Sequence, residues 1–245
     1  MQHTQLALPG LGQIALNKKP GEALQILQEM FDIIRESTGQ DSRACFNQLV
    51  RFLADCLRIQ PLPQEDREVA EKLLPLAIPY LEACAADPWD WLGELFERQE
   101  CGNRRLGQNF TPRPVVRFMV TSVILKVLQA PDDDSQFITV LDPCTGTGRF
   151  LVATATMFPD KPLALFGIEI DTDLYRAALV NMRTFALGRP YRLLRADALV
   201  VDASPDSPNW QQYGNLWNPP PWQEMKLIVG DAPSEGRKLA NPQEK

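Results

Sequence analysis

Several residue types and patterns are scarce in this sequence, and each absence excludes a class of chemistry. The single histidine, His3, excludes a Ser-His-Asp triad and metal centres built on several histidines. The five cysteines are odd in number and form no CxxC pair, so neither a disulfide framework nor a zinc site is indicated. No apolar run is long enough to span a bilayer, and the N-terminus has no signal-peptide pattern. We therefore expect a cytoplasmic protein without a membrane or metal partner.

Positive charge is also in short supply. The 25 Lys and Arg residues against 31 Asp and Glu give a formal net charge of -6, which argues against a general nucleic-acid binder. Basic residues nevertheless gather between Arg98 and Lys126. We expect Arg104, Arg105 and Arg113 to contact DNA, and a solvated basic face is the alternative interpretation.

What the sequence does have is enough apolar content, 44% of its residues, for a substantial core. Apolar residues at three- and four-residue spacing, among them Leu27, Met30, Phe31 and Ile34, predict a helix from residue 21, a second from about Asp41 and a third after residue 63. A short fourth helix is expected over 89–98. We expect Pro75 and Pro79 to kink or break the third helix. Asp87 is the expected N-cap of the fourth.

The pattern changes after residue 102, where short β-rich runs begin to alternate with helical segments. The expected strands are 137–141, 163–168 and 191–194, and the expected helices are 115–128, one from 150, and 173–186. Such alternation predicts an α/β fold with a parallel, Rossmann-like sheet. We divide the chain into an N-terminal arm (1–19), a helical N-terminal region (20–105), a cofactor-binding core (106–232) and a flexible tail (233–245).

The segment most informative about chemistry is Asp142-Pro-Cys-Thr-Gly-Thr-Gly-Arg-Phe150, between an expected strand and an expected helix. Its glycines, Gly146 and Gly148, let backbone N–H groups approach a ligand. Glu169 ends the next strand about twenty residues later, where a carboxylate can accept hydrogen bonds from ribose hydroxyls. This pair of features predicts a cofactor that contains adenosine.

Two cofactor classes compete at this loop. Nicotinamide-binding loops carry a third glycine that lets the helix approach the strand, and Leu151 occupies that position here. A pyrophosphate needs the longer glycine cradle, whereas a methionyl sulfonium does not. The loop therefore favours S-adenosylmethionine over NAD.

The motifs resemble those of N6-adenine DNA methyltransferases, and are most similar to those of the modification subunits of type I restriction-modification systems. Residues 142–151 resemble the cofactor loop of that family. Upstream, Leu106-Gly-Gln-Asn-Phe-Thr-Pro-Arg-Pro-Val-Val116 resembles its Gly-Gln-aromatic-Thr-Pro motif, and Asp90-Trp-Leu-Gly-Glu-Leu-Phe-Glu97 resembles the helix before that motif. The resemblance covers residues 88–200 and implies a Rossmann-like methyltransferase core.

The resemblance also implies a set of contacts with S-adenosylmethionine. They fall on Phe110, Thr111, Pro112, Asp142, Cys144, Thr145, Gly146, Gly148, Phe150, Glu169, Ile170, Asp197 and Ala198. Residues 110–112 would hold the methionyl end, and Asp142 would reach its amino group. Glu169 would take the ribose, Ile170 would cover the adenine, and Asp197 would accept from the adenine amino group. Taken alone, Asp197 is better explained as a turn-forming Asp after a strand.

The family's catalytic motif, Asn-Pro-Pro-aromatic, has a counterpart in Asn218, Pro219, Pro220 and Trp222. The exocyclic amine of adenine is a poor nucleophile because its lone pair is delocalised into the ring. An Asn side-chain oxygen and the carbonyl of Pro219 can accept its hydrogens and direct the lone pair at the methyl group. The aromatic ring stacks on a base flipped out of the duplex.

This motif departs from the family pattern in two ways. Pro221 occupies the aromatic position, so Trp222 comes one residue late, and the stretch before Asn218 is more polar than a buried strand. Only a short stretch follows Trp222, so we expect a truncated relative, a fragment, or a half that needs a partner, such as a specificity subunit or a second methyltransferase subunit. A fortuitous Asn-Pro-Pro in a surface loop is the alternative.

Three functions stay open on the sequence alone. The leading one is methylation of adenine N6 in DNA with S-adenosylmethionine, within a restriction-modification system. The alternative is a catalytically impaired relative that acts as a cofactor- or DNA-binding regulatory partner. Methylation of a small molecule or a protein is the third, and the Asn-Pro-Pro run argues against it.

Overall fold

The computed structural model describes residues 19–102, 108–128, 138–186 and 188–202. The elements in chain order are α1 (Glu22–Thr38), α2 (Ser42–Cys56), the 3-10 turn η1 (Gln64–Asp66), α3 (Arg67–Ala86), α4 (Trp91–Arg98), α5 (Arg113–Leu128), β1 (Ile138–Asp142), α6 (Arg149–Met157), β2 (Leu163–Glu169), α7 (Thr172–Phe185) and β3 (Tyr191–Arg195). Among these residues, no helix combines the length and the apolar character needed to cross a membrane.

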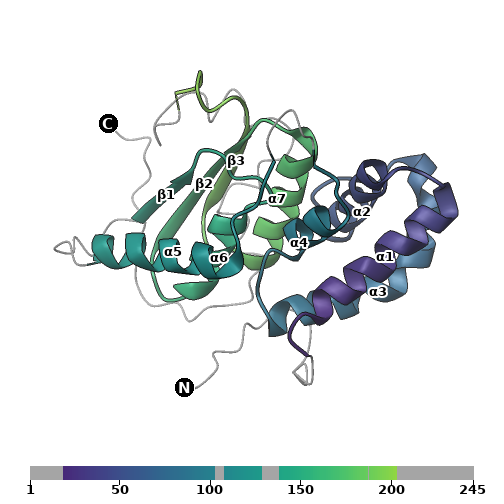
Figure 1. Cartoon of the computed structure of the whole chain (residues 1–245), viewed down its shortest axis with the longest axis horizontal. Coiled ribbons are helices and arrows are strands. Elements are labelled where there is room, and N and C mark those ends of the chain that lie inside the picture. The colour runs from purple at the N-terminus through teal and green to yellow at the C-terminus, as the bar shows by residue number, and fades with distance from the viewer. Residues whose placement is uncertain (1–18, 103–107, 129–137, 187, 203–245) are drawn as a thin grey trace.

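The strands form one parallel sheet in the order β1-β2-β3, so the predicted α/β alternation is confirmed. Asp142 lies opposite Gly167, and Glu169 lies opposite Arg195, so the carboxyl ends of the strands meet at one edge. Helices α6 and α7 connect successive strands and pack against them (Figure 1). Ligands of open parallel sheets bind outside this edge.

The helical N-terminal region follows its hydrophobic periodicity. Leu27, Met30, Phe31 and Ile34 are fully buried along one face of α1, as their spacing predicts. Helix α2 begins at the expected place, where the carboxylate of Asp41 accepts a 2.8 Å hydrogen bond from the backbone N–H of Ala44.

Two details of this region differ from the sequence prediction. Helix α3 runs unbroken through Pro75 and Pro79, because its packing against α1 and α2 offsets the lost backbone hydrogen bonds. The N-cap of α4 is Asp90 and not Asp87, since Asp90 accepts a 2.8 Å hydrogen bond from Gly93 N–H. The carboxylate of Asp87 instead forms a 2.7 Å ion pair with Arg113.

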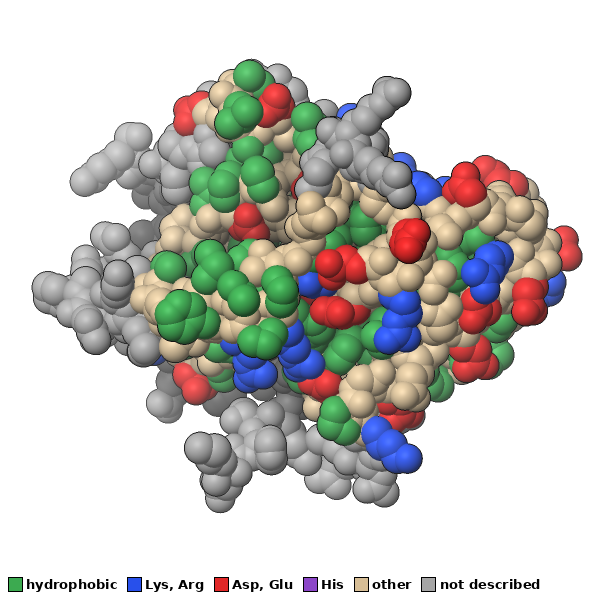
Figure 2. Space-filling model, in the orientation of Figure 1, with side chains coloured by type: hydrophobic (Ala, Val, Ile, Leu, Met, Phe, Trp, Pro, Cys, Tyr) green, Lys and Arg blue, Asp and Glu red, His purple; other side chains and the backbone are tan. Residues whose placement is uncertain are grey.

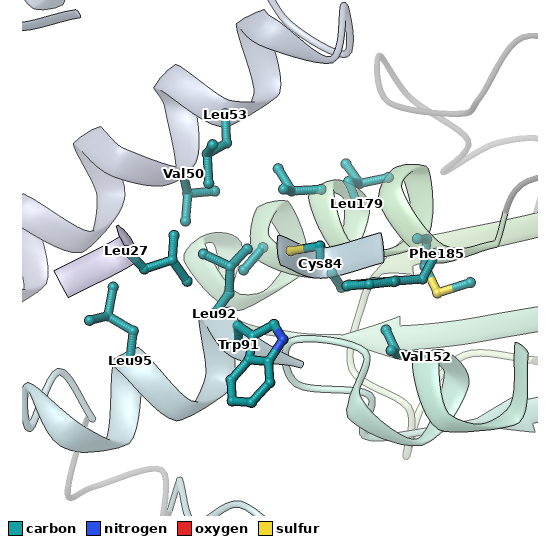
Figure 3. Close-up of a cluster of buried hydrophobic side chains, with 14 of the residues drawn as sticks. Leu27, Val50, Leu53, Cys84, Trp91, Leu92, Leu95, Val152, Leu179 and Phe185 are labelled. Carbon is teal, nitrogen blue, oxygen red and sulfur yellow. The ribbon is translucent and has the colours of Figure 1, made fainter. Parts of the chain in front are cut away.

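One hydrophobic cluster joins the helical N-terminal region to the sheet and its helices. Figure 3 shows Leu27 of α1, Leu92 of α4 and Leu179 of α7 within it. Figure 1 places α7 between the sheet and the helices α1–α3, and α2 packs directly on α7. The predicted boundary at residues 105 and 106 falls within 103–107, outside the described residues. Within the described chain, the N-terminal helices therefore help to support the sheet.

Among the described side chains of α5, residues 113–123, those on one side of the helix are buried. Val116 and Val120 are buried, whereas Phe118 is 72% exposed and Val123 is 59% exposed. Figure 2 shows hydrophobic side chains gathered over this helix, at the left of the view. Among the described elements, α5 packs mainly on α6, which accounts for its buried side.

Candidate functional site

A cavity of about 400 Å³ lies at the carboxyl edge of the sheet, a size typical of small-molecule sites. Four segments far apart in the sequence line it, because the parallel strands bring their ends together. The lining residues are Gln108, Asn109, Phe110, Thr111, Pro143, Cys144, Thr145, Gly146, Arg149, Phe150, Ile168, Glu169, Ile170, Leu174, Ala196, Asp197, Ala198 and Leu199.

Phe110 and Gly146 are in close contact in this cavity. A Cβ at residue 146 would lie 3.2 Å from Cε1 of Phe110, and its backbone has the left-handed φ of 55° that favours glycine. The Phe110 ring packs edge-on against Phe96, which packs edge-on against Phe46 of α2, at 5.7 and 5.0 Å. The glycine predicted to make room for a ligand therefore also makes room for Phe110, which the N-terminal helices support.

Glu169 is fixed at the end of β2 by two backbone groups. Oε2 accepts a 2.8 Å hydrogen bond from Gly146 N–H, and Oε1 accepts one of the same length from Asp171 N–H. Each carboxylate oxygen has a second lone pair, so both can still accept from a ligand. The side chain is only 9% exposed, and this burial raises its pKa despite the two backbone donors.

Asp142 is half-buried at the end of β1, directly before the loop that lines the cavity. Oδ1 accepts a 3.2 Å hydrogen bond from Cys144 N–H, whereas Oδ2 and the nearby Thr145 hydroxyl are buried without a well-formed hydrogen bond to any described group. Burial raises the pKa of Asp142, and the negative charge of Glu169 raises it further. Buried polar atoms left in this state beside a cavity are typical of groups that a ligand satisfies.

Because ionised Asp142 is disfavoured in the folded state, Asp142→Asn is expected to raise the melting temperature near neutral pH. A raised folded-state pKa means that the stability of wild type is complete below the unfolded pKa of about 3.9 and falls as pH rises. The gain should therefore grow with pH and vanish in acid. Thermal denaturation of wild type and Asp142→Asn from acid to neutral pH tests this expectation. Asp160→Asn, at an exposed turn, is the matched control. A constant difference at all pH values would contradict it.

Carboxylates prevail at the cavity, because Glu169 and Asp197 line it while the lining cation Arg149 is paired with three carboxylates of its own. Burial raises the pKa of the Cys144 thiol, and the charges of Asp142, Glu169 and Asp197 raise it further. The Asp197 carboxylate accepts a 2.9 Å hydrogen bond from Leu199 N–H, as a turn-forming Asp does, and it also lines the cavity. Such a site favours a cationic ligand over a pyrophosphate.

The most buried polar group next to the cavity was missed by sequence reasoning. Asp90 is completely buried and accepts four hydrogen bonds through its two oxygens. The donors are Gly93 N–H at 2.8 Å, Asn181 Nδ2 at 2.7 Å, Thr147 Oγ1 at 2.6 Å and Arg149 Nε at 2.9 Å. Asp90 thus ties α4 to the glycine loop, to α6 and to α7. The available sequence signal was the Asp-x-x-Gly spacing at the helix start, which indicated only a cap.

Gly93 is required by this arrangement. A Cβ at residue 93 would lie 2.0 Å from Oδ2 of Asp90 and 2.7 Å from the Thr147 hydroxyl. Real side chains do not approach this closely, so α4 can reach the glycine loop only with glycine at this position.

A second polar network ties α2 to the end of β2. Arg43 donates to Asp171 at 2.6 and 2.7 Å and to Asp173 at 2.8 Å, and Gln108 donates to Asp171 at 2.9 Å. Burial alone would raise the pKa of Asp171, but the hydrogen bonds from Arg43 and Gln108 outweigh it and lower the pKa. Asp171 also caps α7, so this network fixes the loop that carries Glu169 and Ile170.

Most predicted cofactor residues lie together around the cavity: Phe110, Thr111, Cys144, Thr145, Gly146, Phe150, Glu169, Ile170, Asp197 and Ala198. Pro112, Asp142 and Gly148 do not line it. Gly148 precedes α6 and faces Ala178 of α7, where a Cβ would lie 3.6 Å from that of Ala178.

Of the predicted DNA-binding and catalytic residues, only Arg113 lies among the described residues. The guanidinium of Arg113 is paired with Asp87 and lies 4.9 Å from the ring of Trp89, so it is already engaged within the protein. The other predicted residues of these two groups lie outside the described residues: Arg104, Arg105, Asn218, Pro219, Pro220 and Trp222. In the part of the chain that is described, no group of three His, Cys, Asp or Glu side chains could hold a metal ion.

Comparisons with known proteins point to one family. A family model described as N-6 DNA Methylase matches residues 87–223. Among solved structures, a protein from Listeria monocytogenes described as a class I S-adenosylmethionine-dependent methyltransferase is 19% identical, with a TM-score of 0.52, over 75% of this chain and 56% of that one. This likeness shows a shared fold and confirms the predicted Rossmann-like core with a helical N-terminal region.

A second solved structure is a type I restriction-modification methyltransferase subunit from Streptococcus thermophilus. It is 19% identical, with a TM-score of 0.37, over 78% of this chain and 43% of that one. The chain thus spans between 43% and 56% of the length of these two proteins. No curated protein matches the sequence in a direct comparison.

Proposed function

Because this chain belongs to the N-6 DNA methylase family, we propose that it binds S-adenosylmethionine and takes part in methyl transfer to the N6 atom of adenine in DNA. One observation carries the proposal. The structure gathers ten of the thirteen predicted cofactor residues, from four separate segments, around one cavity at the carboxyl edge of the sheet. The negative charge of that cavity suits the cationic sulfonium and amino groups of this cofactor.

The residues present fit the proposed cofactor. The free lone pairs of Glu169 suit ribose hydroxyls, and the unsatisfied oxygens of Asp142 and Thr145 suit the N–H groups of an amino acid. Ile170 lines the cavity although it is 57% exposed, and such an apolar surface suits an adenine ring. When bound, the cofactor supplies an electrophilic methyl group.

The chain's own contribution to the reaction is the handling of the target base. We propose that the side-chain oxygen of Asn218 and the carbonyl of Pro219 accept the two hydrogens of the adenine amine. The nitrogen lone pair would then attack the methyl carbon as the carbon–sulfur bond breaks, and one amine hydrogen would leave to solvent as a proton, so no strong base is required. This explains how a protein whose single histidine is His3 can carry the chemistry. The basic segment with Arg104 and Arg105 is the proposed contact with DNA phosphates.

The sequence of the catalytic motif favours a second candidate, a relative with impaired catalysis. Pro221 occupies the position of the stacking ring, and Trp222 follows it. Base stacking is worth about 1–3 kcal/mol, so its loss would weaken capture of the flipped adenine. In that case the chain binds the cofactor and supports a partner, such as a specificity or second methyltransferase subunit.

Transfer of a tritiated methyl group to duplex DNA separates the two candidates. We expect slow transfer or none by the isolated chain, because its stacking ring is displaced, and higher transfer when the partner subunit is added. Transfer should fall by at least about 100-fold in Asn218→Ala, as for the loss of a preorganised catalytic hydrogen-bonding group. Calorimetry should show binding of S-adenosylmethionine and not of NAD.

The outcomes of this experiment are distinct. Transfer that is indifferent to Asn218→Ala would place the catalytic site elsewhere. Cofactor binding without transfer, even with the partner, would establish the impaired relative. Absence of cofactor binding would overturn the proposed function as a whole.

A further inference from the structure

Arg149 is a buried cation whose side-chain contacts, among the described residues, fall on the segments 89–97 and 110–111. Its side chain is 3% exposed, although it lines the cavity. Nε donates to Asp90 at 2.9 Å, and Nη2 pairs with Glu94 and Glu97 of α4 at 3.3 and 3.1 Å. These three carboxylates fix the guanidinium and raise its pKa, although burial opposes this.

The remaining contacts of Arg149 are with Trp89, whose ring centre lies 5.5 Å from the guanidinium carbon, and with the segment that carries the Phe-Thr-Pro motif. Nη1 donates a 2.9 Å hydrogen bond to the backbone carbonyl of Thr111, and the guanidinium carbon lies 4.7 Å from the centre of the Phe110 ring. Arg149 is also the first residue of α6, directly after the glycine loop. It therefore sets the position of Phe110 and Thr111 relative to that loop.

The other side of the cavity is held by different groups. Glu169 is fixed by Gly146 and Asp171, and the loop after it is fixed by Arg43 and Gln108. No hydrogen bond or ion pair found in the described structure joins Arg149 to Glu169, Ile170 or Asp197. Arg149 makes none of these contacts, although the two sides meet where Gly146 touches Phe110 and where Gln108 belongs to the same segment as Phe110.

We propose that Arg149 is a positioning residue for the amino-acid arm of the cofactor, acting through Phe110 and Thr111 and not on the nucleoside half. This rests on the proposed function, with the methionyl end assigned to residues 110–112 by the family resemblance and the ribose assigned to Glu169. A guanidinium can donate to Asp90, Glu97 and Thr111 at once because its donors form a planar fork. An ammonium group on a flexible chain cannot reproduce this geometry.

The test compares two ligands that differ only in the amino-acid arm. S-adenosylhomocysteine has the arm, whereas 5′-methylthioadenosine retains the nucleoside and sulfur without it. Arg149→Lys is expected to weaken S-adenosylhomocysteine by about tenfold, the size of losing a hydrogen bond to a charged group. Its affinity for 5′-methylthioadenosine should stay within about twofold of wild type. A general loss of fold would weaken both ligands alike.

A second variant keeps the proposal testable if Arg149→Lys does not fold. Glu97 is 40% exposed and touches the cavity only through Arg149, so Glu97→Gln loosens the guanidinium without creating a buried charge. Glu97→Gln should weaken the binding of S-adenosylhomocysteine by about two- to threefold, and its affinity for 5′-methylthioadenosine should stay close to that of wild type.

Three results would overturn the proposal. Equal weakening of both ligands in the folded variants would reduce Arg149 to a structural role. Unchanged affinity for both would remove any role at the cavity. If wild type bound neither ligand, the proposed function would fail first, so the two failures are distinguishable.

Discussion

Replacing Asp90 with alanine is expected to lower the free energy of unfolding by about 3–5 kcal/mol, as when a buried ion pair loses one partner. Asp90 is 0% exposed, and Arg149, its partner at 2.9 Å, is 3% exposed. The substitution also leaves Gly93 N–H, Asn181 Nδ2 and the Thr147 hydroxyl without their acceptor. For a chain of this size, the melting temperature should fall by about 6–20 °C.

Asparagine should be nearly as damaging as alanine at this position. A carboxylate accepts only, and all four groups around Asp90 donate to it. An amide would point its own N–H groups at two of these donors. Asp90→Asn thus separates the need for an acceptor-only group from the need for side-chain volume.

Asp32→Ala is the matched control, because Asp32 pairs with Arg35 at 2.7 Å while the two side chains are 38% and 52% exposed. An exposed pair contributes about 0–1 kcal/mol, so this variant should unfold close to wild type. Urea denaturation of the three variants gives the comparison. If Asp90→Ala were as mild as Asp32→Ala, Asp90 would not be the link between α4 and the glycine loop.

Glu169→Ala is expected to weaken S-adenosylhomocysteine by on the order of 10- to 100-fold, as hydrogen bonds to a charged group contribute about 1.5–3 kcal/mol. Both carboxylate oxygens are already oriented by Gly146 and Asp171, so little ordering is left to be done on binding. In contrast to Arg149→Lys, this variant should weaken 5′-methylthioadenosine as well, because that ligand retains the ribose.

Calorimetry with both ligands measures this effect. Glu71→Ala, an exposed carboxylate on α3, controls for net charge and should bind as wild type does. Glu169→Ala also leaves two backbone N–H groups without their acceptor, so a cooperative thermal transition must first show that this variant is folded. A folded Glu169→Ala that bound both ligands normally would remove Glu169 from the site.

Much of the fold followed from local pattern in the sequence. The spacing of Leu27, Met30, Phe31 and Ile34 predicted α1, and Asp41 was identified as the start of α2, because periodicity and capping act within a few residues. The order of strand, glycine loop and helix around residues 142–150 placed the cofactor loop. Glu169 was found for the same reason, since parallel strands bring their carboxyl ends to one edge.

The supports of the site could not be predicted in this way. Asp90 and Arg149 are 59 residues apart, and Arg43 and Asp171 are 128 apart, so no local pattern connects them. Asp87 is of a residue type that often caps helices, but its carboxylate pairs with Arg113, which is distant in the sequence. Helix α3 continued through two prolines for a similar reason, since packing on α1 offsets weak local propensity.

The sequence by itself therefore determined which residues could bind a cofactor, because those residues occur in short motifs at fixed positions along strands and loops. Only the tertiary structure decided what holds them. The energy of a buried carboxylate or guanidinium depends on the charges and donors that surround it in space. Arg149 is one residue after the glycine loop in the sequence. In the folded protein it is the group that joins α4, Thr111 and α6 beside the cavity.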